Sequence, residues 1–269
     1  MSNAYLEQYK QQNLRACQLK LLDILGEIDR ICRKHGIDYW LDGGSILGAV
    51  RHQGFIPWDD DIDIAMTLDG LKRFVAVAPA ELGDRYELQT LDDKQNKEPI
   101  TKVRDKNSFF VEGADNFDVP YPKGLYVDIF PFIDYPTVSR KFIKTFSRQV
   151  SRSYSILHKQ HYYSLRAAAE LIWFGVKYGF CRAVLAAVFA VKPKGVYMSN
   201  ILINNGYGIM HRCDSIFPLS AIGFEGRTFP APHNPDAYLK DLYNNYMEIP
   251  PEDKRKVHSV FFMPELIKP

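Results

Sequence analysis

The first 35 residues show the apolar spacing of a surface helix. Leucine, isoleucine and cysteine recur at intervals of three, four and seven positions, as Leu14, Leu21, Leu25, Ile28 and Cys32. This period places them on one face of a helix. We therefore predict an amphipathic helix over residues 4–35. We expect Gly36 to end it, because glycine readily adopts the left-handed conformation that closes a helix.

The chain that follows alternates between short apolar runs and helical periods. We predict helices at 68–82 and 235–246, and a Gly-Gly turn followed by a short helix that Ser45 caps and that runs to about residue 52. Strand patterns fall at 37–41, 61–66, 86–91, 100–104, 109–112 and 125–130, with a hairpin at 222–229. This succession of helices and strands indicates an α/β or α+β sheet protein.

Residues 137–199 differ from the rest of the chain, and we interpret them as a helical insert. Apolar or aromatic residues at steps of three and four share one face, namely Ile143, Phe146, Val150, Tyr154, Leu157 and His161. Residues 167–189 are almost wholly apolar, interrupted by three charged residues. The longest uncharged run nearby is 183–191, far shorter than the ~20 residues of a spanning helix, so we predict no transmembrane span.

The composition is that of an ordinary globular protein. The chain has 269 residues, of which 46% are hydrophobic and 25% charged, and this excludes a disordered or disulfide-stapled chain. A net charge of +2 gives no general attraction to nucleic acid, so we expect no nucleic-acid partner. Four cysteines without metal-ligand spacing indicate free thiols, and the N-terminus lacks a signal-peptide pattern. We therefore expect a cytoplasmic protein.

The small net charge conceals a contrast between two parts of the chain. The stretch 140–194 carries 11 basic residues and a single acid, Glu170, so its net charge is +10 and that of the remainder is −8. Aromatic residues lie among these charges, at Trp173, Phe174, Tyr178 and Phe180. This combination favours peripheral contact with an anionic membrane at its cytoplasmic face. The alternative is a helical lid with solvated charges.

The strongest chemical signal is an acidic run that ends in alternation with isoleucine, Asp59-Asp60-Asp61-Ile62-Asp63-Ile64. On a strand, Asp61 and Asp63 point to the same side, and Asp59 could join them. Carboxylates packed so closely repel one another, and a divalent cation is the usual compensation. A solvated acidic loop is the alternative, but isoleucines on the opposite side fix the strand in a core and favour the metal site.

Gly43, Gly44 and Ser45 stand between a predicted strand and a predicted helix. Glycines let a phosphate approach the backbone, and the first amides of a helix favour an anion. A tight turn would explain this Gly-Gly pair on its own. When a strand with an Asp-x-Asp pattern follows, the combination is more specific and is typical of phosphoryl chemistry on a nucleotide.

Two further strands and the short helix supply charged residues. Asp128 interrupts an apolar strand, and because a buried lone carboxylate is costly, we expect it to be a metal ligand or a base for an acceptor hydroxyl. A structural ion pair is the alternative. Lys102 and Arg104 alternate along another strand and could hold phosphate oxygens, as could Arg51 from the short helix. A solvated surface position is the alternative for each of these cations.

These residues together resemble a known family. The stretch Tyr39–Asp63 resembles the signature of LicD-type proteins, members of the nucleotidyltransferase-fold superfamily that are similar to fukutin-related enzymes. Later blocks also resemble it, namely Lys102-Val103-Arg104-Asp105, Val127-Asp128-Ile129-Phe130-Pro131 and the segment from Tyr238 to His258. The resemblance implies an α+β fold with a nucleotidyltransferase-like mixed sheet flanked by helices. Residues 1–136 and 200–269 would form this catalytic domain, and 137–199 the basic insert.

The resemblance also implies an activity. Such proteins are Mg²⁺-dependent transferases, with Mn²⁺ as the alternative ion. They move phosphocholine or an alditol phosphate from a CDP-linked donor to a hydroxyl of a cell-surface glycan, such as teichoic acid or lipopolysaccharide, or of its lipid-linked precursor. By this analogy Asp59, Asp61, Asp63 and Asp128 bind the metal, and the last three are catalytic. The residues that bind substrate would be Gly43, Gly44, Ser45, Arg51, Lys102, Arg104 and His258.

Three other functions fit part of the pattern. A glycosyltransferase that uses a nucleotide-sugar would carry its Asp-x-Asp motif after some 100 residues, and Asp61 comes too early for that. A conventional nucleotidyltransferase would transfer the nucleotide rather than the phosphorylated alcohol. A non-catalytic binding subunit is disfavoured because every expected ligand is present in the sequence.

Overall fold

The computed structural model describes residues 4–90, 100–112, 122–159, 164–201, 209–243, 245–255 and 257–266. The chain divides into two compact units. The first comprises Met1–Pro131 and Pro218–Pro269, and the second comprises Phe132–Phe217. The expected insert, 137–199, falls within the second unit.

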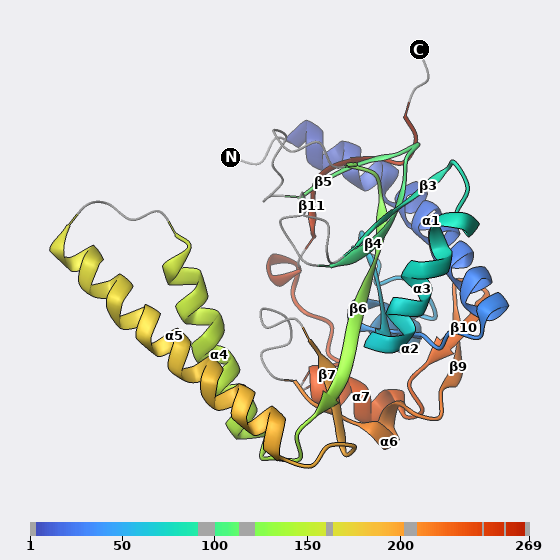
Figure 1. The fold of residues 1–269 in the computed structure, drawn as a ribbon. Helices are drawn as coiled ribbons and strands as arrows, with labels where there is room; N and C mark the ends of the chain where they lie inside the picture. Colours follow the sequence, from blue (N-terminus) through green and yellow to red (C-terminus); the bar gives the residue numbers. More distant parts are fainter. Residues whose placement is uncertain are drawn as a thin grey trace. The chain divides into compact units, whose positions relative to one another are not determined.

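Four α-helices of the first unit follow the apolar periods of the sequence (Figure 1): α1 (Ala4–His35), α2 (Gly43–His52), α3 (Leu68–Glu81) and α7 (Pro235–Leu242). The long N-terminal helix is confirmed, and its apolar face, including Leu21, Leu25 and Ile28, is fully buried. Gly36 follows it with φ of +60°, the left-handed conformation expected there. A short 3-10 helix, Glu252–Lys254, lies near the C-terminus.

The strands of this unit belong to a mixed sheet in the order β1-β2-β6-β4-β3, and the α+β prediction is confirmed. Their bounds are β1 (Trp40–Leu41), β2 (Ile62–Thr67), β6 (Tyr126–Tyr135), β4 (Thr101–Asp105) and β3 (Tyr86–Gln89). The core strand β2 buries Ile62 and Ile64 completely, as the alternation with aspartate predicted. The antiparallel register of β4 and β6 places Lys102 directly opposite Asp128.

Two smaller strand pairs complete the first unit. The predicted hairpin is present as β9 (Ser220–Phe224) and β10 (Arg227–Ala231). A second pair joins β5 (Phe109–Glu112) to β11 (Ser259–Met263), and this pairing was not anticipated. It brings the C-terminal segment beside residues 147–154 positions earlier in the chain.

The second unit contains a helical hairpin and a small group of strands. The last residues of β6 pair with β7 (Tyr197–Asn200), which pairs with β8 (His211–Arg212) before the short helix α6 (Cys213–Ile216). The predicted helical insert is present as α4 (Arg140–Leu157) and α5 (Leu165–Val191), which pack against each other (Figure 1). His161, placed on the α4 face from the sequence, lies outside the described residues.

One local prediction was wrong, and the prediction of no transmembrane span stays a prediction. The cap of α2 is Asp42 rather than Ser45, because the helix begins three residues earlier than expected and includes the Gly-Gly pair. By length and composition alone, the 27-residue helix α5 is apolar enough to cross a membrane. Charged residues divide its sequence into short uncharged runs, but the helix continues through them.

Candidate active site

Strand β2 and the first turn of α2 lie side by side, joined by side-chain bonds at the acidic motif. The Asp42 carboxylate caps α2, accepting a hydrogen bond from the Gly43 amide at 2.8 Å. The Ser45 hydroxyl accepts one from the backbone amide of Asp63 at 2.9 Å. The predicted phosphate-binding residue Ser45 therefore also fixes the position of Asp63 relative to the helix.

The two glycines allow carboxylates to lie directly against this helix turn. A Cβ atom on Gly44 would lie 2.8 Å from Oδ2 of Asp59, and one on Gly43 would collide with the carboxylate of Asp63. Gly43 also has φ of +50°, a conformation that favours glycine. The helix N-terminus attracts negative charge, so its partial positive charge faces both carboxylates.

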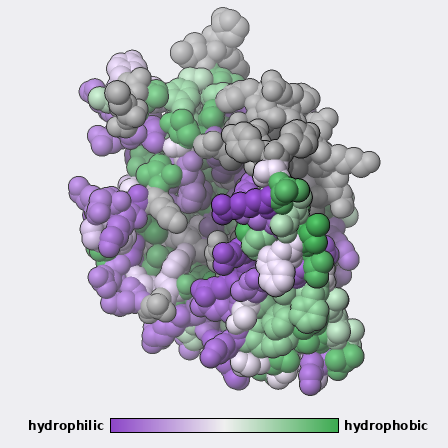
Figure 2. Space-filling view, turned by 90° about the vertical axis from the view of Figure 1, so that its left-hand side faces the viewer, coloured by the Kyte–Doolittle hydropathy of each residue, from purple (hydrophilic) through white to green (hydrophobic). Residues whose placement is uncertain are grey.

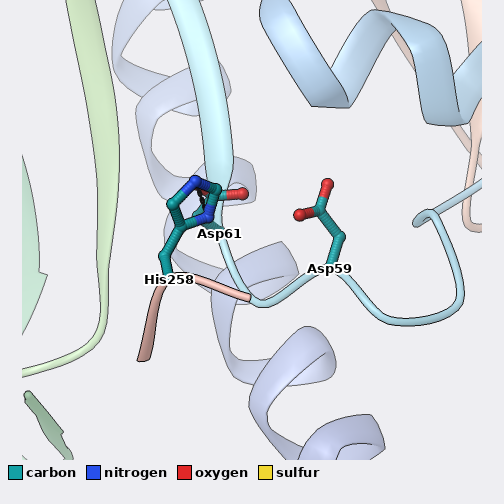
Figure 3. Close-up of side chains that lie close together, drawn as sticks. All are labelled: Asp59, Asp61 and His258. Carbon is teal, nitrogen blue, oxygen red and sulfur yellow. Dashed lines mark ion pairs between the residues drawn. The ribbon is translucent and has the colours of Figure 1, made fainter. Parts of the chain in front are cut away.

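Asp59, Asp61 and His258 form the group that could hold a metal ion (Figure 3). One ligand atom from each lies within 4.8 Å of the others, and no other such group of three occurs in the described part of the chain. His258 Nδ1 lies 2.8 Å from Oδ2 of Asp61. Asp63 and Asp128, expected as ligands from the sequence, fall outside this group of three.

Asp63 and Asp128 nevertheless share the electrostatic field of the group. Burial raises the pKa of Asp63 well above its usual value, and repulsion from Asp61 and Asp128 raises it further. Burial likewise raises the pKa of Asp59, again with repulsion from Asp61. The site thus holds more negative charge than its own cations neutralise. Oxygen-rich, mutually repelling carboxylates are the environment that a hard divalent cation compensates, so these residues fit such an ion.

Asp128 lies across β4 and β6 from the predicted phosphate ligand Lys102. Lys102 Nζ lies 3.1 Å from Oδ1 of Asp128, and both side chains are buried. Burial still raises the pKa of Asp128, to about 6, because the lysine offsets only part of the desolvation. The pKa of Asp128 is therefore close to the value that suits a general base near neutral pH.

The other expected phosphate-binding cations hold parts of the protein. Arg104 is buried, with Nε 2.8 Å from Oε1 of Gln89 and Nη1 3.0 Å from the carbonyl of Gly124. Arg51 donates from Nη1 to the carbonyl of Tyr246 at 3.1 Å. The structure thus places Arg104 within the sheet and Arg51 against the segment after α7.

Asp60 is a buried member of the acidic run that sequence reasoning left without a role. Its carboxylate accepts hydrogen bonds from the amides of His258 and Ser259, at 3.0 and 2.9 Å, and from the Ser259 hydroxyl. Burial alone would raise its pKa, but the His258 side chain, the Ser259 hydroxyl and the two amides together hold the pKa below its usual value. Asp60 therefore anchors the segment that carries His258 beside Asp61. The only sequence signal was its position between two acidic residues.

Two tyrosines near the site were also missed as functional residues. Tyr238 is fully buried and donates to Oδ1 of Asp42 at 2.6 Å, which supports the cap of α2. Burial and the carboxylates of Asp63 and Asp42 raise the pKa of Tyr243, so this phenol lies in the field of the acidic group. Both follow the β9–β10 hairpin, about 180 residues after the acidic run, and no local spacing links them to it.

Comparison with known proteins shows which family this sequence is similar to. Residues 36–167 match a family model described as LicD/FKTN/FKRP, nucleotidyltransferase domain. The chain is 28% identical to the lipopolysaccharide cholinephosphotransferase LicD of Haemophilus influenzae, over 93% of this chain and 97% of that protein. It is 36% identical to the human ribitol 5-phosphate transferase FKRP over 38% of this chain, but only 17% of that protein. Residues 36–167 therefore form a LicD-family nucleotidyltransferase domain, and the chain is a LicD-like phosphotransferase.

Proposed function

We propose that this chain transfers a phosphorylated alcohol, phosphocholine or an alditol phosphate, from a CDP-linked donor to a glycan hydroxyl. The acceptor would be a cell-surface glycan or its lipid-linked precursor, and a divalent cation, Mg²⁺ or Mn²⁺, would assist. The observation that carries the proposal is the set of carboxylates at Asp59, Asp61 and Asp63 beside the first turn of α2. An anion-binding helix end next to a cation site suits a pyrophosphate donor.

The residues of the site would have different roles, some binding the cation and others shaping the helix end beside it. Asp59 and Asp61, with His258, would hold the cation, and Asp63 and Asp128 add to the negative field beside it. When bound, the cation would supply positive charge to the donor pyrophosphate. Gly43 and Gly44 let the carboxylates of Asp63 and Asp59 lie directly against the helix end, where a larger residue would leave them no room.

Asp128 is the residue that we assign to the acceptor hydroxyl. In the transfer, the hydroxyl oxygen bonds to the phosphorus of the phosphorylated alcohol, the bond from that phosphorus to the bridging oxygen breaks, and CMP leaves. The hydroxyl proton passes to an oxygen of Asp128, whose raised pKa suits it to accept a proton. Lys102, paired with Asp128 at 3.1 Å, stabilises the carboxylate before the transfer.

The relatives support the reaction class. The names of LicD from Haemophilus influenzae and of FKRP state transfer of choline phosphate and of ribitol 5-phosphate respectively. These two alcohols differ in charge and size, so the relatives support transfer of a substituted phosphate group without choosing the alcohol.

Calorimetric binding with and without Mg²⁺ tests the proposal directly. The ligands are CDP-choline, CDP-ribitol, CDP-glycerol, a UDP-sugar and CTP. We expect Mg²⁺-dependent binding of one CDP-alcohol, and that result also names the donor. Preference for the UDP-sugar or for CTP would instead indicate glycosyl or nucleotidyl transfer. Absence of binding to all five would favour a non-catalytic subunit.

A further inference from the structure

Helix α5 is an apolar helix with almost no burial. Only 6% of its most apolar stretch is buried within the protein, and Cys181 is its one fully buried residue. Ile172, Trp173 and Phe180 are 69, 65 and 63% exposed. A water-soluble helix normally buries such residues or confines them to one packed stripe, so this surface requires a covering partner.

One face of α5 is entirely free of charge. Residues at steps of three and four, all exposed and none polar, follow each other along its whole length: Leu165, Ala168, Ile172, Val176, Gly179, Ala183, Ala186 and Ala190. The charged residues lie elsewhere on the helix. Glu170 pairs with Lys159 and Arg166, and Lys177 lines an apolar groove of about 390 Å³ between α4 and α5, with Phe146 and Trp173.

Helix α4 carries the complementary pattern. Its buried positions, including Ile143 and Val150, face inward. Its basic residues are all exposed and recur at steps of about four, as Arg140, Lys141, Lys144, Arg148 and Arg152. Figure 2 shows hydrophobic side chains gathered at its lower right, beside hydrophilic ones.

We propose that the α4–α5 hairpin attaches this chain to an anionic phospholipid bilayer. The uncharged face of α5 enters the hydrocarbon region, and the basic face of α4 lies among the headgroups. Charge decides the occupant: stretch 140–194 has a net charge of +10, so the same hairpin of a second copy would be repelled from this face, whereas anionic lipid is attracted. The bilayer would be the membrane partner of the proposed transferase, and the link from this attachment to an acceptor rests on the proposed function. The test of the attachment does not depend on that function.

Vesicle co-sedimentation of the full chain tests the attachment. The vesicles are phosphatidylcholine alone, or with about a third phosphatidylglycerol. We expect binding to the anionic vesicles that weakens strongly in about 0.5 M salt, where surface charges are screened. The double variant K144Q/R148Q should bind about 25-fold more weakly, because each basic residue near an anionic surface contributes about fivefold. The control K72Q/K106Q removes two exposed lysines of the first unit and should change nothing.

A second pair of variants tests insertion. Ile172→Asp places a carboxylate on the uncharged face of α5 and should reduce binding at least about tenfold. Its control, Leu19→Asp, changes a leucine on α1 that is 46% exposed. Lipids brominated deep in the acyl chain should quench Trp173, and Trp173→Phe should remove that quenching, since Trp40 is fully buried and Trp58 belongs to the first unit, where Arg255 covers its ring.

Three results would overturn the proposal: absence of vesicle binding, binding that ignores anionic lipid, or an Ile172→Asp variant that binds like the native chain. Donor binding is measured by calorimetry without vesicles, so failure of the transferase proposal is seen separately from failure of the membrane proposal.

Discussion

Replacement of Asp60 by asparagine should release the C-terminal segment from the acidic loop. The carboxylate is fully buried and accepts three hydrogen bonds, two of them from backbone amides at 2.9 and 3.0 Å. Asparagine keeps the shape but puts an NH₂ group in place of one acceptor oxygen. One of the two backbone amides, of His258 or Ser259, then faces the asparagine NH₂ group, which is itself a donor. The other amide keeps an acceptor, but this oxygen no longer carries a negative charge.

The size of the effect follows from those contacts. A hydrogen bond to a charged group contributes about 1.5–3 kcal/mol, and an unsatisfied buried amide costs about 1–3 kcal/mol. We therefore expect Asp60→Asn to lower the free energy of unfolding by about 2–4 kcal/mol. Asp253→Asn is the matched control, because Asp253 is exposed on the same C-terminal segment, and its change should stay within about 0.5 kcal/mol.

Urea denaturation of both variants in EDTA measures the free energy of unfolding without metal. Amide hydrogen exchange, read by mass spectrometry over residues 257–263, reports the local effect. We expect faster exchange there in Asp60→Asn, and weaker Mg²⁺-dependent donor binding because His258 loses its fixed position. If Asp60→Asn matched Asp253→Asn in stability and in exchange, the anchoring role of Asp60 would be refuted.

Three further results are expected at the acidic group. Asp63→Asn should abolish turnover in a transfer assay while circular dichroism stays native, and near-normal turnover would contradict its role. Gly44→Ala should weaken Mg²⁺-dependent donor binding measured by calorimetry, because its methyl group would lie 2.8 Å from Oδ2 of Asp59, whereas Gly223→Ala, with open space around it, should not. The pKa of buried Asp128 is raised to about 6, so the native state keeps a proton that the unfolded state has already released. As the pH rises from about 4 to about 6, the free energy of unfolding of the metal-free chain should therefore fall, by up to about 3 kcal/mol from this group. Urea denaturation of Asp128→Asn over the same pH range should show a shallower decline.

Local patterns in the sequence predicted the elements well where packing follows a single period. The α1 helix, the α3 helix and the alternation of β2 each have one apolar face, so spacing alone identifies them. The cap of α2 was misplaced because glycine is compatible with both a turn and a first helical residue. Asp42, which accepts from the Gly43 amide, decides between them only in the folded chain.

The long-range parts of the site could not be predicted in the same way. The family resemblance indicated His258 as a substrate-binding residue, but its contact with Asp61 depends on β11 pairing with β5. The anchoring role of Asp60 has the same origin. Lys102 was expected to bind phosphate, and only the register of β4 and β6 shows that it lies opposite Asp128. Such partners are set by tertiary pairing, which residue spacing does not encode.

The bonds from Asp60 to residues 198 and 199 positions later also set a time order for assembly on the ribosome. At about 5–20 residues per second, translation needs about 10–40 seconds to deliver His258 and Ser259 after Asp60 has been made. During that interval the acidic loop lacks its C-terminal partners, and the metal group lacks its histidine. The site is therefore completed late in synthesis, and a chain that stops before residue 258 would carry the acidic motif without the segment that holds it in place.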